Sequence, residues 1–141
     1  MSQKTLINPK TKELIDKARA VRANAYAPYS NYRVGVALRT TDGQIFTGVN
    51  VENCAYPTSM CAERNALATA VGMGFREFEE VVIATQADEK GLSGTPCGAC
   101  RQALAEFGLD LRVVLVTDVS DETREYILRD LLPDAFTPES L

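Results

Sequence analysis

Histidine is absent from the 141 residues of this chain. Without an imidazole, the Ser–His and Cys–His nucleophile systems of many hydrolytic enzymes are excluded. A zinc site in this protein would have to use sulfur or carboxylate ligands. Proton transfer in any reaction would likewise depend on a group other than histidine.

The chain also lacks long apolar stretches. No apolar run approaches 18 residues, and the polar start does not have the charged and then apolar pattern of a secretory leader. We therefore expect neither a membrane-spanning helix nor secretion. The default expectation is a cytoplasmic protein.

Basic residues are in the minority, since 15 Lys and Arg stand against 19 Asp and Glu, for a net charge of −4. Nucleic acids and anionic membrane surfaces are bound largely through basic clusters, so neither partner is predicted. Apolar residues make up 45% of the chain and charged residues 24%, which is typical of a folded globular protein. The length suits one domain, residues 1–141, with a core that needs no disulfide bonds.

Hydrophobic periodicity predicts helices and strands in alternation. A strong hairpin signal, Asp42-Gly43, separates the first two strands. Segment 123–132 is ambiguous between strand and helix. Together the elements predict a three-layer α/β domain with a mixed sheet. The expected helices are 14–25, 61–71 and 96–107, and the expected strands are 33–39, 44–52, 79–87 and 111–117.

Three cysteines and one glutamate form the constellation most suggestive of chemistry. Cys97 and Cys100 open a predicted helix just after Thr95-Pro96, and Cys61 opens another. The free N–H groups of a helix start lower thiol pKa values and stabilise thiolates. Three thiolates leave one corner of a zinc tetrahedron free for water, as in a catalytic site. Glu63 would carry the protons of that water.

Other readings of these cysteines are open on the residues alone. Cys97 and Cys100 could form a redox disulfide or a structural metal knuckle. Cys54 could complete a closed, non-catalytic zinc module with four sulfurs, or it could be a buried free thiol that packs as a small apolar residue.

The charge of such a site needs compensation, because zinc with three thiolates carries a net charge of about −1. Arg64 lies three residues after Cys61 and can donate hydrogen bonds to its sulfur. Arg101 could do the same for the second helix, although an ordinary surface role is equally compatible with its position.

Segments 61–63 (Cys-Ala-Glu) and 96–100 (Pro-Cys-Gly-Ala-Cys) match the zinc-dependent deaminase signature, with Cys in place of His. The chain resembles the small, homotetrameric cytidine deaminases, and the likeness extends to 26–30, 48–53 and 131–136. The resemblance implies a three-layer α/β/α fold with about five strands, in which 123–132 forms a short strand and a final helix. It also implies one zinc ion per chain, active sites at subunit interfaces, and conversion of cytidine and deoxycytidine to uridine and deoxyuridine plus ammonia in pyrimidine salvage.

The resemblance assigns roles to individual residues. It makes Cys61, Cys97 and Cys100 the zinc ligands, Glu63 the catalytic acid and base, and Arg64 the residue that compensates thiolate charge. Glu63 would take a proton from the attacking water, pass it to ring N3 and assist departure of ammonia. The substrate-binding residues would be Asn50, Glu52, Tyr32, Ala62, Tyr56 and Phe136.

Several of these assignments have alternatives. Asn50 and Glu52 share one face of a predicted strand, roughly 6–7 Å apart; the pattern alone favours two solvent-facing side chains, and the resemblance reverses that preference. The resemblance places Phe136 at a neighbouring subunit's site, whereas the sequence alone favours a position in the chain's own core. Tyr32 occupies a position where relatives more often have Phe, and Asp134 one where glycine is more usual.

A second enzyme reading is a deaminase for a modified cytosine nucleoside such as blasticidin S. The motif 50–52 and the Glu63-Arg64 pair favour ordinary nucleosides. An RNA- or DNA-editing deaminase would need a basic strand-binding surface, which the charge balance does not indicate.

Overall fold

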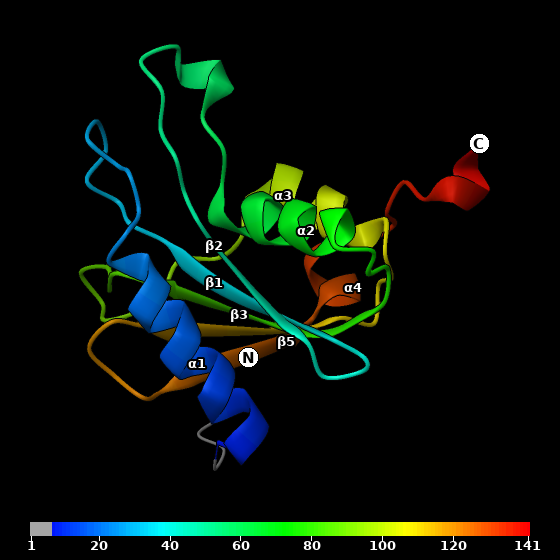
Figure 1. The fold of residues 1–141 in the computed structure, drawn as a ribbon, viewed down its shortest axis with the longest axis horizontal. Coiled ribbons are helices and arrows are strands. Elements are labelled where there is room, and N and C mark those ends of the chain that lie inside the picture. The colour runs from blue at the N-terminus through cyan, green and yellow to red at the C-terminus, as the bar shows by residue number, and fades with distance from the viewer. Residues whose placement is uncertain (1–6) are drawn as a thin grey trace.

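The computed structural model describes residues 7–141, in which a five-stranded sheet lies between helices on both faces (Figure 1). None of the helices in this part of the chain is both long and apolar enough to cross a membrane. The helices are α1 (Pro9–Arg22), α2 (Ala62–Gly72), α3 (Gly98–Ala105) and α4 (Leu128–Leu131). The strands are β1 (Gly35–Thr40), β2 (Ile45–Val49), β3 (Phe78–Thr85), β4 (Arg112–Thr117) and β5 (Thr123–Ile127).

The sheet has the strand order β2-β1-β3-β4-β5. Strands β3 and β4 run parallel, with Thr85 beside Thr117, and every other neighbouring pair is antiparallel. The parallel pair requires a crossover, which α3 provides. Ligands of such sheets bind beyond the carboxyl ends of parallel strands, and the loop that leads into α3 begins there.

The core has two layers, one on each face of the sheet. Val82 and Ala84 of β3 pack with α1 on one face. Val81 and Ile83 pack with α2, α3 and α4 on the other. Successive side chains of β3 therefore point alternately into the two core layers. The predicted α/β/α architecture with a mixed sheet is confirmed.

Local signals explain where most elements begin. The side chain of Asn8 accepts a hydrogen bond from the Thr11 backbone N–H at 2.8 Å, and Pro9 occupies the first turn of α1. The ambiguous segment 123–132 resolves into β5 followed directly by α4, as the resemblance implied. After α4, Asp134 adopts a left-handed conformation with φ 52°, which explains why glycine suits this position.

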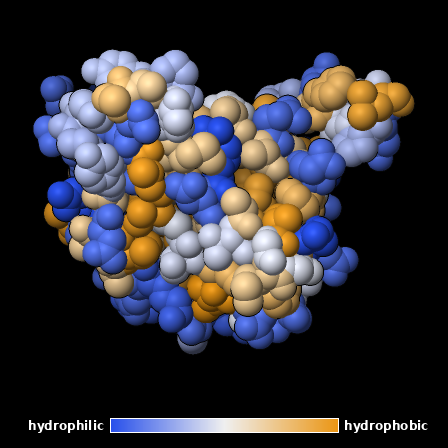
Figure 2. All heavy atoms as spheres, turned by 45° about the horizontal axis from the view of Figure 1, so that its top comes forward, coloured by the Kyte–Doolittle hydropathy of each residue, from blue (hydrophilic) through white to orange (hydrophobic). Residues whose placement is uncertain are grey.

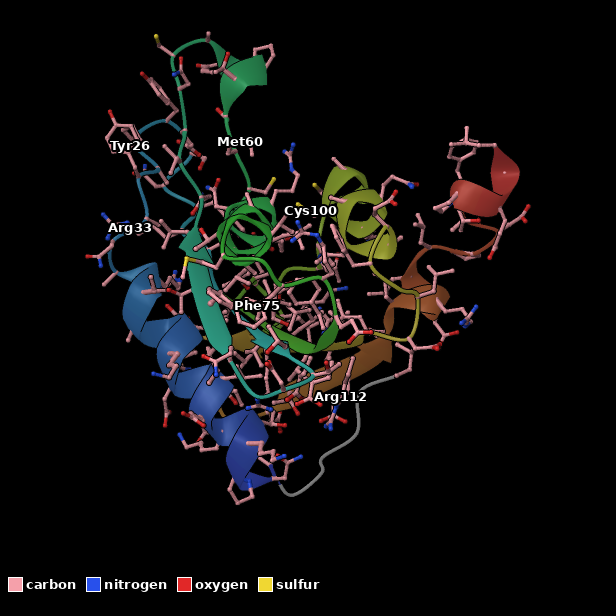
Figure 3. All side chains as sticks on the ribbon, turned by 45° about the vertical axis from the view of Figure 1, so that its right-hand side comes forward. Tyr26, Arg33, Met60, Phe75, Cys100 and Arg112 are labelled. Atoms are coloured by element: carbon pink, nitrogen blue, oxygen red, sulfur yellow. The ribbon has the colours of Figure 1, made fainter. Side chains whose placement is uncertain are left out.

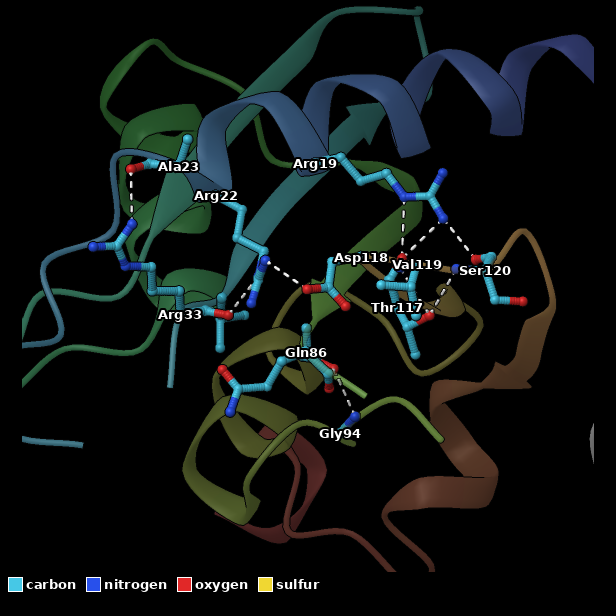
Figure 4. Close-up of polar contacts among 12 residues, drawn as sticks. Arg19, Arg22, Ala23, Arg33, Gln86, Gly94, Thr117, Asp118, Val119 and Ser120 are labelled. Atoms are coloured by element: carbon cyan, nitrogen blue, oxygen red, sulfur yellow. Dashed lines mark hydrogen bonds and ion pairs between the residues drawn. The ribbon is translucent and has the colours of Figure 1, made fainter. Parts of the chain in front are cut away.

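Two arginines close the loop of residues 23–34 that joins α1 to β1 (Figure 4). Arg22 Nε donates to the Arg33 carbonyl at 2.8 Å, and Arg33 Nη1 donates to the Ala23 carbonyl at 3.4 Å. Arg22 also pairs with Asp118, just beyond β4, at 3.3 Å. The loop is thus anchored to α1 and to the carboxyl end of β4.

Helix α2 lies unusually close to β2, and Gly48 permits this approach. A Cβ atom at Gly48 would stand 2.5 Å from the Ala66 nitrogen and 2.6 Å from the Ala62 oxygen. Those are backbone atoms of the helix, so no side-chain rotation could relieve the clash. The small residues of α2 complete the fit, since Ala62, Ala66 and Ala70 are all fully buried.

We therefore predict that Gly48→Ala destabilises the protein by about 1–3 kcal/mol, because overpacking would displace α2 from the sheet. Gly72→Ala is the matched control. A Cβ atom at Gly72 would meet nothing within 4 Å at the last residue of the same helix, so we expect little change or a slight gain in stability. Chemical denaturation of both variants measures the difference. Equal stability would contradict the proposed close approach.

Candidate active site

Cys61, Cys97 and Cys100 come together at the N-terminal ends of two neighbouring helices. Cys61 is the residue that precedes α2, Cys97 precedes α3, and Cys100 lies in the first turn of α3. Their three sulfurs all lie within 4.8 Å of one another. Figure 3 shows Cys100 between α2 and α3. The convergence of three thiols that the sequence suggested is present.

The spacing of the sulfurs fits a metal ion better than a disulfide. The Cys61 and Cys97 sulfurs are 3.8 Å apart, and those of Cys97 and Cys100 are 3.5 Å apart. A tetrahedral zinc ion with Zn–S bonds of about 2.3 Å places its sulfurs about 3.8 Å apart. A disulfide requires about 2.05 Å, and all of these cysteines are free. The redox-disulfide reading is therefore wrong for this structure.

Cys54 does not belong to this group. It is exposed, and its sulfur lies 3.7 Å from the Asn53 side-chain oxygen. The closed four-sulfur module is therefore wrong, and so is the expectation of a buried, packing thiol, because the loop that carries Cys54 extends away from the helices. Three sulfurs leave the fourth corner of a tetrahedron open.

The electrostatics of the cluster suit a cation. Hydrogen bonds from Cys100 and Arg64 lower the pKa of Cys61 to about 5. The hydrogen bond with Cys61, together with burial, raises the pKa of Cys100 above its ordinary value. The sulfurs by themselves therefore stabilise one thiolate, and a cation among them is needed to stabilise the others. The donor set fits zinc, which favours thiolate ligands.

Arg64 supplies the positive charge beside the sulfurs. Its Nη2 donates to the Cys61 sulfur at 3.7 Å, as its position three residues later in the helix predicted. Arg101 points elsewhere, because its guanidinium donates to the carbonyls of Pro96 at 2.7 Å and Leu131 at 2.8 Å. Charge compensation by Arg101 is therefore not observed. Arg101 instead ties α3 to α4.

Glu63 is a buried carboxyl in the first turn of α2, with only 5% of its surface exposed. Burial raises its pKa above the ordinary value, and the neighbouring Cys61 thiolate acts in the same direction. A carboxyl of this kind exchanges protons closer to neutral pH than an exposed glutamate does. The position and environment of Glu63 suit a proton carrier.

A cavity of about 310 Å³ connects this centre with the polar residues expected to bind substrate. Its wall includes Cys61, Cys97, Glu63 and Ala62, and also Tyr32, Asn50 and Glu52. The sequence analysis assigned no site role to the other residues of the wall, because nothing in the sequence shows that they converge: Ser30, Val34, Ile83, Thr85 and Thr95. A cavity of this size can hold a small organic molecule.

Asn50 and Glu52 are both tied to the loop of residues 23–34. Asn50 accepts the Val34 backbone N–H at 2.8 Å and donates to the Tyr32 carbonyl at 2.7 Å. Glu52 accepts hydrogen bonds from the Ser30 hydroxyl and from nearby backbone N–H groups, and these bonds lower its pKa. Glu52 is therefore held as a carboxylate at the cavity wall.

The hydroxyl of Tyr32 fits beside Gly94. A Cβ atom at residue 94 would stand 2.0 Å from that oxygen. The Gly94 backbone N–H in turn donates to the Thr85 hydroxyl at 2.8 Å. A tyrosine at this position is thus accommodated because residue 94 is glycine, a pairing of distant residues that the sequence does not reveal.

Tyr56 and Phe136 do not line this cavity. Tyr56 is 70% exposed and borders a neighbouring cavity of about 360 Å³ that shares Glu52 with the first. Phe136 is 60% exposed in the C-terminal tail, which projects from the body of the molecule (Figure 1). The alternative that Phe136 packs in the chain's own core is wrong. Its expected role at a neighbouring subunit stays a prediction.

Comparison with known proteins gives a consistent result. Residues 8–117 match the family model described as "Cytidine and deoxycytidylate deaminase zinc-binding region". A probable cytidine deaminase of Dictyostelium discoideum is 44% identical over 127 residues, which are 90% of this chain and 84% of that protein. The cytidine deaminase of Sporosarcina psychrophila is 43% identical over 92% of this chain and 93% of its own.

Solved structures agree with these relatives. The crystal structure of cytidine deaminase from Burkholderia pseudomallei superposes with a TM-score of 0.83 at 45% identity, covering 89% of this chain and 98% of that one. The structure from Mycobacterium leprae gives a TM-score of 0.72 at 38% identity, covering 87% and 97%. With its fold, its three-sulfur centre and these matches, the chain belongs to the cytidine and deoxycytidylate deaminase family.

Proposed function

We propose that this protein catalyses the zinc-dependent hydrolysis of cytidine and deoxycytidine to uridine and deoxyuridine, with release of ammonia. The observation that carries the proposal is a buried glutamate beside three sulfurs spaced for zinc, in one cavity with an amide and a carboxylate. The names of the relatives support the same substrate class. We further propose that the reaction serves pyrimidine salvage in the cytoplasm.

A zinc ion held by Cys61, Cys97 and Cys100 would supply Lewis-acid activation of water at the open fourth corner. Three thiolates would reduce the effective positive charge of the zinc ion, and the chain's own contribution is to limit that reduction. Arg64 and the N-terminal ends of α2 and α3 withdraw negative charge from the sulfurs. The fold therefore tunes the site through charges placed around the ligands.

Glu63 is the proton carrier in this proposal. It accepts one proton from water as the water oxygen bonds to C4 of cytosine, and it delivers that proton to ring N3. It then moves the second proton to the amino group, which departs as ammonia while the C4 carbonyl forms. Its buried position at the cavity wall keeps bulk water away from the exchanging protons.

The remaining wall residues would bind and orient the nucleoside. Asn50 and Glu52 offer hydrogen-bond partners for sugar hydroxyls, and the Tyr32 ring lies where it can pack beside the pyrimidine. Ala62 is fully buried and has no side chain beyond Cβ, so the base can approach the first turn of α2. These roles follow from the shared cavity and from the resemblance.

We also propose that four one-domain chains assemble, with Tyr56 and Phe136 completing active sites at subunit interfaces. Aromatic and apolar side chains near the cavity support this assembly by their exposure: Tyr26 56%, Tyr29 49%, Val51 46% and Tyr56 70%. The tail also presents apolar surface, visible in orange at its tip in Figure 2. Surfaces of this kind commonly mark protein contacts.

Glu63→Gln tests the catalytic role. Because glutamine cannot exchange protons, we expect cytidine turnover to fall by about 10²–10⁴-fold while zinc content stays unchanged. Ultraviolet absorbance follows the conversion of cytidine to uridine, and elemental analysis gives the zinc content. Glu106→Gln, a change of the same kind at the exposed end of α3, should leave the rate as it is. Wild-type turnover in Glu63→Gln would refute the assignment.

Metal removal tests the zinc centre. We expect a chelator to abolish turnover, and zinc added back should restore it and release about one proton or more per ion, since thiols bind zinc as thiolates. Calorimetry in buffers of different ionisation enthalpy counts those protons. Cys61→Ser should bind zinc poorly, whereas Cys54→Ser should bind it as the wild type does. Loss of zinc in Cys54→Ser would overturn the three-sulfur centre.

Phe136→Ala tests the interface. Because Phe136 is exposed and does not line the cavity of its own chain, we expect normal zinc content and a KM for cytidine raised by about tenfold, from the lost packing of one aromatic ring. Sedimentation should show four chains in the wild-type particle. A fully active monomer would contradict the proposed role of this residue.

A further inference from the structure

The hydroxyl of Ser30 joins two parts of the proposed sugar site. It donates to the Oε2 atom of Glu52, and it accepts the Tyr32 backbone N–H at 3.0 Å. The other carboxylate oxygen of Glu52, Oε1, accepts the backbone N–H groups of Tyr29 at 2.9 Å and of Ser30 at 3.1 Å. One turn of the loop therefore supplies three donors to a single carboxylate.

This arrangement limits what Glu52 can still bind. A carboxylate has about four acceptor positions, two on each oxygen. Oε1 uses both of its positions for backbone N–H groups, and Oε2 uses one for Ser30. One acceptor position on Oε2 is left, so Glu52 can accept a hydrogen bond from one further hydroxyl group.

The same turn also connects Glu52 to Asn50. The backbone N–H of Tyr32 is bound by the Ser30 hydroxyl, and the carbonyl of Tyr32 accepts the Asn50 amide at 2.7 Å. Asn50 and Glu52 lie beyond the end of β2, where bridges from Val51 to Tyr26 and to Met60 fix the backbone but not the direction of these two side chains. The hydrogen bonds of the turn therefore set the direction of the two side chains.

We infer that Ser30 is a positioning residue for the substrate's sugar: its hydroxyl orients Glu52 so that the one remaining acceptor position faces a single sugar hydroxyl, and links this carboxylate through Tyr32 to Asn50. This inference rests on the proposed function. It goes beyond it by assigning a residue that does not itself need to touch the reacting atoms. Ribose and deoxyribose share the 3′- and 5′-hydroxyls, and the inference assigns this acceptor position to the 3′-hydroxyl, which is attached directly to the sugar ring.

Ser30→Ala removes the hydroxyl and leaves Glu52 with its two backbone donors. Oε1 stays bound to these donors, but Oε2 loses its only anchor and with it a fixed direction toward the sugar. We expect the KM for cytidine to rise about five- to tenfold with kcat within about twofold, as for a bond that substrate and transition state use equally. Ser30→Thr keeps a hydroxyl at the same place and should restore the wild-type KM.

The experiment compares cytidine with 3′-deoxycytidine as substrates of wild type, Ser30→Ala and Ser30→Thr. Wild type should prefer cytidine in kcat/KM, and Ser30→Ala should reduce that preference about fivefold by weakening cytidine alone. Ser120→Ala is the matched control, because the Ser120 hydroxyl accepts the Glu122 N–H at 3.1 Å in the loop after β4, away from the cavity. It should keep the wild-type preference.

Glu52→Gln provides a second test that does not depend on Ser30→Ala alone. If Ser30 acts through Glu52, adding Ser30→Ala to Glu52→Gln should raise the KM less than twofold further. If the double variant instead raised the KM by the product of the two single-variant increases, the inference would be overturned. The same conclusion would follow from an unchanged substrate preference in Ser30→Ala, equal losses of kcat for both substrates, or a Ser30→Thr variant that behaves like Ser30→Ala.

These outcomes are distinct from failure of the proposed function. If the zinc-loaded wild type did not deaminate cytidine at all, both proposals would fall together. If it deaminated cytidine and the Ser30 variants retained the wild-type KM and substrate preference, only the role of Ser30 would be rejected.

Discussion

The meeting of two helix N-termini is the constraint on which the rest of the structure depends. Cys61 and Cys97 are separated by 36 positions in the chain, yet their sulfurs lie 3.8 Å apart because α2 and α3 begin side by side on one face of the sheet. Gly48 allows α2 to lie against β2, and the parallel pair of β3 and β4 sets the course of α3. Small residues and strand order thus determine the geometry of a metal centre to which they contribute no ligand.

Charge balance links the site to the fold. Thiolates beside a buried carboxylate would repel one another in an apolar core. The N-terminal ends of the helices and the Arg64 guanidinium offset that repulsion. Cys61 can therefore ionise although the Glu63 carboxyl beside it is buried, with only 5% of its surface exposed. The opposite wall uses backbone donors for the same purpose, since N–H groups of one turn stabilise the Glu52 carboxylate. Cys61 and Glu52 therefore each have a local source of positive potential.

The three-layer architecture, the strands β1 to β4 and the helices α1 to α3 could be predicted from the chain because each has a clear hydrophobic period or punctuation. Segment 123–132 could not be assigned by its pattern, since β5 and α4 follow each other without a turn residue between them. The direction of Arg101 was equally out of reach. Its hydrogen bond to the Leu131 carbonyl depends on the packing of α3 against α4, and Leu131 lies 30 positions away in the chain.

The sequence by itself determined the donor types: without histidine, a zinc site had to use sulfur or carboxylate ligands, and Cys61, Cys97 and Cys100 with Glu63 carried the resemblance to the deaminases. The tertiary structure decided which groups surround that chemistry. In the folded chain, Cys54 lies outside the sulfur cluster and Phe136 is exposed to solvent. The Tyr32 hydroxyl lies beside Gly94, and the Ser30 hydroxyl donates to Glu52. The physical reason is that ligand type follows from residue identity, whereas exposure and hydrogen-bond partners depend on contacts between segments distant in the chain.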